Sequence, residues 1–189
     1  MKQPARAHQT TFDHFHVGLL QVHGELRQQA SAILAAAAGD GRVPTSAGQL
    51  IAGFCENLEN HHRSEDAFFF PAFRAAGRLR STDIAFLDVR DDEHAALVRL
   101  VGELRPLAAR ARDGSLLQAT WRGSVQRLVT EVTDIAGPHF AAEESVLTPD
   151  HVAEMISACE LGEVYRDMGM NWNARLPVPD LPVPLDADL

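Results

Sequence analysis

Apolar side chains recur every three or four residues along almost the whole of this 189-residue chain. A repeat of that length is typical of α-helices that turn one face to a protein core. No stretch alternates apolar and polar residues as a half-buried strand requires. Glycine and proline interrupt the pattern at 39–44, 77 and 113–115. We therefore expect an all-α protein with four long helices, spanning 12–38, 45–76, 82–112 and 116–147.

Short turns between long helices place each helix antiparallel to the next, which predicts an up-down-up-down four-helix bundle. Thr148 and Pro149 form a helix start, with a capping hydroxyl and a proline at the first helical position. They predict a short fifth helix that ends near 168. Residues 169–189 contain four prolines and are expected to form an extended Pro-rich C-terminal tail. The predicted division is a helical bundle at 1–168 and the tail at 169–189.

The inward stripe of each long helix carries side chains that an apolar core rarely holds. These side chains are His23 on the first helix, His61 and Glu65 on the second, His94 on the third, and His139 and Glu143 on the fourth. Burying such groups without partners costs several kcal/mol each. A bound metal would satisfy all of them together, so the pattern predicts a metal site.

The spacing of these residues is compatible with one shared site. Residues four apart lie on one helix face, so His61 can act with Glu65, and His139 with Glu143. His23 lies about as far from the end of its helix as His61 lies from the start of the next, so the two should reach the same depth. The depths of His94 and His139 match less well, and we expect a longer third turn or the Gly137-Pro138 pair to absorb the difference.

The same residues resemble the hemerythrin-like family, the HHE cation-binding domain. The matching segments are His23-Gly-Glu-Leu-Arg27, His61-His-Arg-Ser-Glu65-Asp66 running on to Phe70-Pro71, Asp92-Glu-His94, and His139-Phe-Ala-Ala-Glu143-Glu144. The resemblance implies a four-helix bundle around two non-haem irons with a bridging oxo or hydroxo group. It makes the four histidines terminal ligands and the two glutamates bridges. The donor types also admit manganese or zinc.

Two departures separate the chain from the oxygen-carrying hemerythrins. Those proteins have a fifth histidine one turn from the third-helix histidine, where this chain has Arg90 and Val98. Their last helix supplies an aspartate five residues after its histidine, where this chain has Glu143 after four. The resemblance therefore points to the four-histidine, two-glutamate branch, whose members bind or activate dioxygen, peroxide or nitric oxide. The alternative is a module that senses oxygen, nitric oxide or iron, or handles iron, without turnover, and the sequence leaves open whether the protein is an enzyme.

Composition limits the partners. The chain has 26 acidic and 17 basic residues and a formal net charge of −9, which disfavours nucleic acid and anionic membranes. Cys55 and Cys159 form no CxxC pair, so neither a disulfide framework nor a zinc–thiolate site is expected. We see no signal peptide in the polar residues 1–11 and expect a cytoplasmic protein. The tail could engage a protein partner or a second copy of the chain.

Several other residues have competing interpretations. His16 shares a stripe with His23 but lies two turns away, so it is expected to be a residue behind the ligands, a channel residue or a satisfied core histidine rather than a ligand. His62 is expected to lie beside the site without binding metal, and Tyr165 to be structural. Asp66 and Glu144 are either solvated or orient the imidazoles, and Asp91 is the preferred candidate for orienting His94.

Overall fold

The computed structural model describes residues 5–39, 45–113 and 118–172, and these residues form helices without any strand. The all-α prediction is therefore confirmed for this part of the chain. The helices are α1 (Ala5–Ala38), α2 (Thr45–Ser64), the π-helix η1 (Glu65–Phe69), α3 (Phe70–Ala75), α4 (Ser81–Asp113), α5 (Gln118–Val146), α6 (Pro149–Met155) and α7 (Ala158–Trp172).

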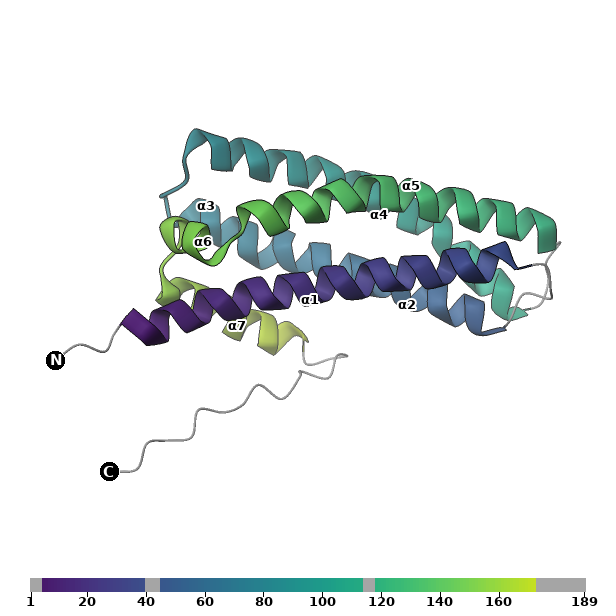
Figure 1. Ribbon diagram of the computed structural model, residues 1–189, viewed down its shortest axis with the longest axis horizontal. Helices are drawn as coiled ribbons and strands as arrows, with labels where there is room; N and C mark the ends of the chain where they lie inside the picture. Colours follow the sequence, from purple (N-terminus) through teal and green to yellow (C-terminus); the bar gives the residue numbers. More distant parts are fainter. Residues whose placement is uncertain (1–4, 40–44, 114–117, 173–189) are drawn as a thin grey trace, which may run out of the picture.

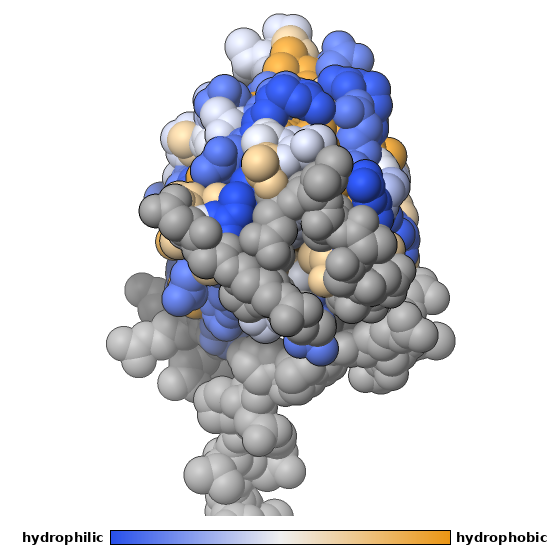
Figure 2. All heavy atoms as spheres, turned by 90° about the vertical axis from the view of Figure 1, so that its right-hand side faces the viewer, coloured by the Kyte–Doolittle hydropathy of each residue, from blue (hydrophilic) through white to orange (hydrophobic). Residues whose placement is uncertain are grey.

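The four long helices α1, α2, α4 and α5 run lengthwise through the molecule (Figure 1). α1 packs against α2 and α5, and α4 packs against the same two helices. The short helices gather at one end, where α6 and α7 contact α1, and α7 also contacts η1 and α3. Figure 2 looks onto the other end, where hydrophilic residues dominate the coloured surface and apolar ones show as small patches.

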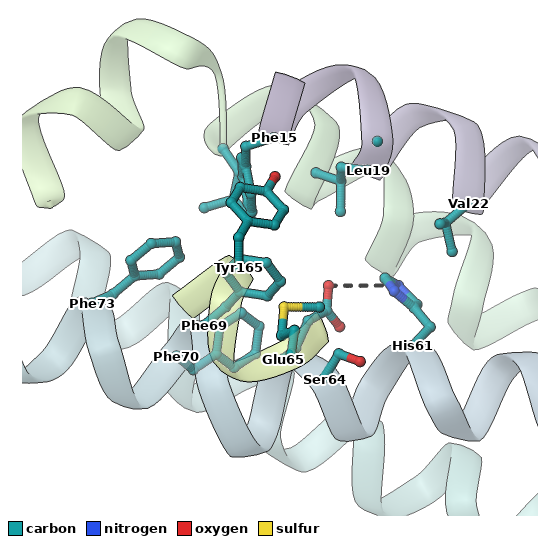
Figure 3. A pocket seen from close by; sticks show the side chains of 13 residues that line it. Phe15, Leu19, Val22, His61, Ser64, Glu65, Phe69, Phe70, Phe73 and Tyr165 are labelled. Atoms are coloured by element: carbon teal, nitrogen blue, oxygen red, sulfur yellow. Dashed lines mark ion pairs between the residues drawn. The ribbon is translucent and has the colours of Figure 1, made fainter. Parts of the chain in front are cut away.

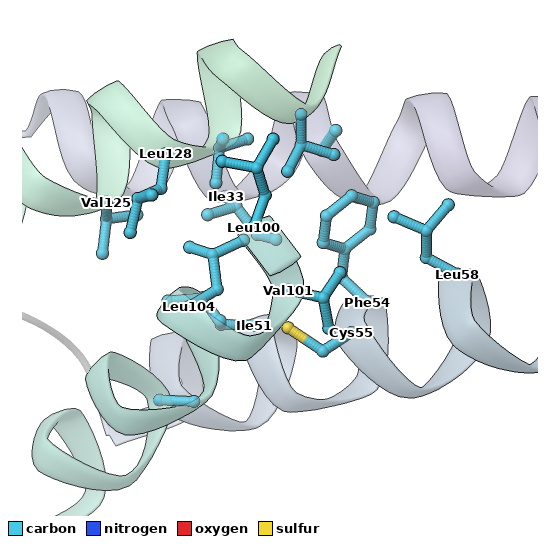
Figure 4. Packing of buried hydrophobic residues seen from close by; sticks show 14 of the residues in the cluster. Ile33, Ile51, Phe54, Cys55, Leu58, Leu100, Val101, Leu104, Val125 and Leu128 are labelled. Atoms are coloured by element: carbon cyan, nitrogen blue, oxygen red, sulfur yellow. The ribbon is translucent and has the colours of Figure 1, made fainter. Parts of the chain in front are cut away.

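Two hydrophobic clusters fill the interior. The larger core joins residues of α1, α2, α4 and α5, among them Ile33, Ile51, Leu104 and Val125 (Figure 4). The smaller core joins the beginning of α1 and α4 to η1, α3, α6 and α7. On α1 and α4, the predicted histidine lies between a segment that enters the smaller core and a segment that enters the larger one. Apolar packing on both sides therefore holds the polar cluster at one level.

The predicted second helix is not continuous. It passes at Glu65 from α-helix into the π-helix η1 and returns to α-helix at Phe70, whose N–H donates to the carbonyl of Glu65. Pro71 has no N–H to continue the α-helical ladder, and its ring displaces the carbonyl one turn earlier. The proline thus accounts for the wider turn before it. Gly77 then ends the segment in a left-handed conformation with φ of +66°, as predicted for a helix C-cap.

The prediction of one continuous fifth helix is wrong, because the structure divides that segment into two helices. Thr148 caps α6 as expected, but Ile156 is extended and separates α6 from α7. Ser157 and Glu160 then form a capping box, in which the Ser157 N–H donates to the glutamate and the Glu160 N–H donates to the serine hydroxyl. α7 continues to Trp172, so residues 169–172 are helical rather than extended. The rest of the predicted Pro-rich tail, the breaks at 40–44 and 114–115, and the predicted start of the fourth helix at 116 lie outside the described residues.

Candidate metal centre

All six predicted site residues are buried, and none exposes more than 6 % of its surface. His23 comes from α1 and His61 from α2, while Glu65 is the first residue of η1. His94 comes from α4, and His139 and Glu143 come from α5. The structure therefore brings together in space all six residues that the sequence predicted as metal ligands.

The histidines meet in two pairs through their Nε2 atoms. The Nε2 atoms of His23 and His61 lie 3.0 Å apart. Those of His94 and His139 lie 3.2 Å apart. Each pair joins two neighbouring helices of the bundle, and each is made of atoms that can bind a metal.

Each glutamate divides its two oxygens between these pairs. Glu65 places Oε1 3.5 Å from Nε2 of His61 and Oε2 3.5 Å from Nε2 of His94. Glu143 places Oε2 3.3 Å from Nε2 of His23 and Oε1 3.2 Å from Nε2 of His139. The donor atoms consequently fall into two four-residue groups that share both glutamates. Each group is compact enough for one metal ion.

Three carboxylates outside these groups hold the imidazoles in place. Nδ1 of His23 donates to Glu144 at 3.0 Å, Nδ1 of His94 to Asp66 at 2.7 Å, and Nδ1 of His139 to Glu93 at 2.8 Å. A carboxylate behind a histidine fixes which ring nitrogen carries the proton and which way the ring faces. Here it leaves Nε2 as the free lone pair.

Asp91 does not orient His94, contrary to the prediction. Its side chain is 47 % exposed and pairs with Arg74 at 2.7 Å. Asp66 orients His94 in place of Asp91, and Glu93 orients His139. The role of Glu93 was missed because it follows from how α4 faces α5, although Glu93 stands directly before His94 in the chain. Arg90 is buried, and its Nε lies 2.8 Å from Oε2 of Glu93, so the guanidinium stabilises that carboxylate.

The donor set fits a cation. Burial lowers the pKa of His61 to about 3 and also lowers the pKa of His94, so both rings are neutral at pH 7. A neutral ring that donates through Nδ1 offers only a lone pair at Nε2. The cluster therefore points lone pairs and carboxylate oxygens at one another. Oε2 of Glu65 and both oxygens of Glu143 are buried with no hydrogen-bond partner in the described part of the chain.

The two carboxyl groups differ in their electrostatic surroundings. Burial raises the pKa of Glu65, and the negative charge of Glu143 adds to that increase. Burial alone would also raise the pKa of Glu143, but the imidazoles of His139 and His23 beside it outweigh burial and hold that pKa below its usual range. A carboxylate binds metal as the anion, and the lowered pKa of Glu143 favours that form.

Two further histidines lie near the cluster and differ in their contacts. His16 donates through Nδ1 to the carbonyl of Leu147 at 3.0 Å, as expected for a satisfied core histidine. His62 is buried and stacks on His94, with ring centroids 4.2 Å apart. Its Nε2 has no hydrogen-bond partner among the described residues. A nitrogen of His62 also groups with those of His94 and His139 closely enough for one metal ion.

Aromatic rings shield the cluster from water. Phe140 stacks on His23 with centroids 4.2 Å apart, and Phe70 stacks on His94 at 5.7 Å. Both phenylalanines are buried. Rings in this position fix the imidazoles and lower the local dielectric, which strengthens the interaction of the donors with a cation.

Fold and site together define an all-helical protein with a buried histidine–glutamate cluster that can hold cations. Residues 11–85 match the family model of the hemerythrin HHE cation binding domain, which confirms the family resemblance over that part of the chain. The match covers less than half of the chain and includes His23, His61 and Glu65, while His94, His139 and Glu143 lie beyond it. Comparisons with curated proteins and with solved structures found no match. Within the described residues, no helix is both long and apolar enough to cross a membrane.

Proposed function

We propose that the cluster is a non-haem di-iron centre that binds or activates dioxygen, peroxide or nitric oxide. His23 and His61 would hold one iron, His94 and His139 the other, and Glu65 and Glu143 would bridge them. The observation that carries the proposal is the division of each glutamate's oxygens between the two histidine pairs. That arrangement is the one two adjacent cations require.

The proposal includes the arrangement of the bundle. We infer that α1, α2, α4 and α5 alternate in direction, as short connections between long helices favour. The contacts of α1 and α4 with both α2 and α5 support this order. In such a bundle the four helices can each turn one histidine to a common level.

The chemistry of the donors favours iron. Neutral imidazole and carboxylate suit iron, and they also accept manganese or zinc. When bound, the iron pair would supply redox chemistry and an open position for a small ligand. Two imidazoles and two carboxylate oxygens for each metal leave room for such a ligand. Glu144, Asp66 and Glu93 would fix the imidazoles, while Phe140 and Phe70 would exclude bulk water.

The test is metal analysis of the full-length protein after anaerobic loading with Fe(II), with absorption spectra before and after exposure to air. We expect about two irons per chain and new charge-transfer bands after air. A His61→Ala, Glu65→Ala double variant should lose both. The matched control is Asp91→Ala, which removes an exposed carboxylate that does not contact the cluster. One metal or none in the wild-type protein would contradict the proposal.

A further inference from the structure

An apolar cavity of about 170 Å³ adjoins the cluster, between α1, η1, α3 and α7. Its lining is almost entirely apolar and includes several phenylalanine rings. Figure 3 shows Phe69 and Tyr165 on one side of the Glu65 carboxylate and His61 on the other. The cavity therefore runs from an aromatic wall to the edge of the candidate metal centre.

The aromatic wall is built from rings that brace one another. Phe15 meets Phe69 edge to face, with centroids 5.0 Å apart and an interplanar angle of 66°. Tyr165 meets Phe69 in the same way at 5.9 Å and 81°. Such pairs are favourable and hold their rings apart at fixed angles. The wall consequently keeps its shape and cannot simply collapse into the space.

The space is half open to solvent, yet its lining is almost entirely apolar. The atoms of such a lining lose dispersion contacts unless a ligand fills the space. Water is a poor occupant, since it needs several polar partners and this lining offers few. An apolar cavity of roughly 150 Å³ is known to remain dry and bind benzene. The volume here suits one aromatic ring of similar size.

The polar end of the cavity belongs to the cluster. His61 and Glu65 both line the cavity, and Oε2 of Glu65 is buried without a hydrogen-bond partner among the described residues. A molecule in the cavity would therefore lie against His61 and Glu65. η1 places Glu65 and Phe69 one π-helical turn apart, so the wider turn joins the aromatic wall to the carboxylate.

Gly18 marks the entrance. It is exposed on α1, lines the cavity, and has no atom within 4 Å of the position a Cβ would take. The half-buried Val22, one turn further along α1, lines the same side. A side chain added at Gly18 would therefore start in open space beside the cavity.

We propose that this cavity binds a small apolar organic molecule about the size of one aromatic ring, held against His61 and Glu65. The assignment rests on the di-iron function proposed above, because it names the substrate class of that centre. The ring walls favour a flat aromatic occupant. A charged molecule would lose its hydration without gaining partners on the apolar walls.

The test uses fluorobenzene and the full-length protein, followed by fluorine NMR. We expect saturable binding of one molecule per chain. Gly18→Leu should weaken binding by about tenfold or more, equivalent to about 1.4 kcal/mol. The matched control is Gly24→Leu, since Gly24 is also exposed on α1 with nothing within 4 Å but does not line the cavity. Both changes favour the helix, so neither variant should fail to fold.

A second measurement locates the ligand. The fluorine signal of bound fluorobenzene should relax faster in protein loaded with Fe(II) than in protein loaded with Zn(II), because only Fe(II) is paramagnetic. Equal relaxation in the two forms would place the ligand elsewhere and overturn the proposal. So would wild-type affinity in both Gly18→Leu and Val22→Trp.

Iron content measured on the same samples separates the two proposals. A protein that holds two irons but does not bind fluorobenzene would overturn the cavity proposal alone. Binding of xenon without binding of fluorobenzene would also overturn it, because that result indicates a passage for gases. Saturable fluorobenzene binding that Gly18→Leu weakens, in a protein with fewer than two irons, would support the cavity and contradict the di-iron centre.

Discussion

The Nε2 atoms of His94 and His139 face each other at 3.2 Å, although each ring already donates its Nδ1 proton to a carboxylate. Because Nδ1 of each ring is engaged in this way, Nε2 is the atom that each ring has left to bind a cation. A metal ion between the two Nε2 atoms would satisfy both. In the proposed metal centre, Asp66 and Glu93 would therefore do more than satisfy two buried nitrogens, because they would also orient both rings for metal.

Removing one of these outer carboxylates should weaken metal binding without removing a donor. We expect Glu93→Ala to lower the affinity for Fe(II) by roughly 10–100-fold, the usual effect of losing a partner behind a ligating histidine. The measurement is competition with a coloured chelator under anaerobic conditions. Asp91→Ala is the control, since Asp91 lies on the same helix and pairs with Arg74 instead. Equal affinities for the two variants would show that Glu93 does not prepare His139.

His62 offers a separate test because two roles predict different results. The sequence predicts no metal binding by His62, but its unpartnered Nε2 and its grouping with His94 and His139 favour a nitrogen ligand at that metal position. His62→Phe keeps a flat ring that can stack on His94 but removes the nitrogens. We expect this variant to weaken one of the two Fe(II)-binding steps by at least about 10-fold, the usual effect of losing a partner behind a ligating histidine. Calorimetry measures the two steps.

The control for His62 is His16→Phe, which alters a histidine that donates to the carbonyl of Leu147. That variant should bind both metals as the wild type does. Two unchanged binding steps in His62→Phe would mean that stacking on His94 is the whole role of His62. Added imidazole should restore the weakened step in His62→Ala, where the missing ring leaves space for it.

The convergence of the six residues could be predicted because it depends on regular geometry. The four-residue spacing of His61 and Glu65 puts both on one face, and depth along the helix separates His23 from His16. In the structure His23 lies in the cluster, whereas His16 bonds to a backbone carbonyl outside it. Periodicity carries this kind of information across long helices.

Other features depend on contacts between helices or on local exceptions to helical geometry. Glu93 reaches His139 because of how α4 turns toward α5, and no spacing within α4 reveals that. The break at Ile156 had a signal in Ser157 and Glu160, which have the spacing of a capping box. The π-helix before Pro71 is harder to predict from the sequence, since proline permits several distortions of a helix and packing selects among them.

The two cysteines should differ sharply in reactivity. Burial raises the pKa of the Cys55 thiol to about 11, so almost none of it is thiolate at pH 8, whereas Cys159 is exposed. Because the thiolate is the reactive form, we expect one thiol per folded chain to react with a disulfide reagent at pH 8. Cys159→Ser should abolish that reaction, and denaturant should restore one reactive thiol. Rapid labelling of Cys55 in the folded chain would contradict its burial in the larger core.

Asp83 is expected to make stability depend on pH at the end of the bundle where α4 begins. It is buried and accepts hydrogen bonds from the backbone N–H of Arg80 at 2.8 Å, from its guanidinium at 3.1 Å and from His151 at 3.1 Å. Burial alone would raise the pKa of Asp83, but these hydrogen bonds outweigh it and lower the pKa. A lowered pKa in the folded state contributes stability above the unfolded pKa, near 4, that is lost as the pH falls through the folded value.

Asp83→Ala should therefore reduce the free energy of unfolding at pH 7, by about 1–3 kcal/mol, because it removes several hydrogen bonds to a charged acceptor. The difference from wild type should shrink as the pH falls from about 4, where Asp83 of the unfolded chain takes up a proton, towards the lower pKa of the folded state. Urea unfolding at a series of pH values measures both effects. Asp88→Ala, an exposed carboxylate on the same helix that pairs with Arg74, should change stability by less than about 1 kcal/mol. A pH-independent difference for Asp83→Ala would mean that its packing, rather than its charge, stabilises this end of the bundle.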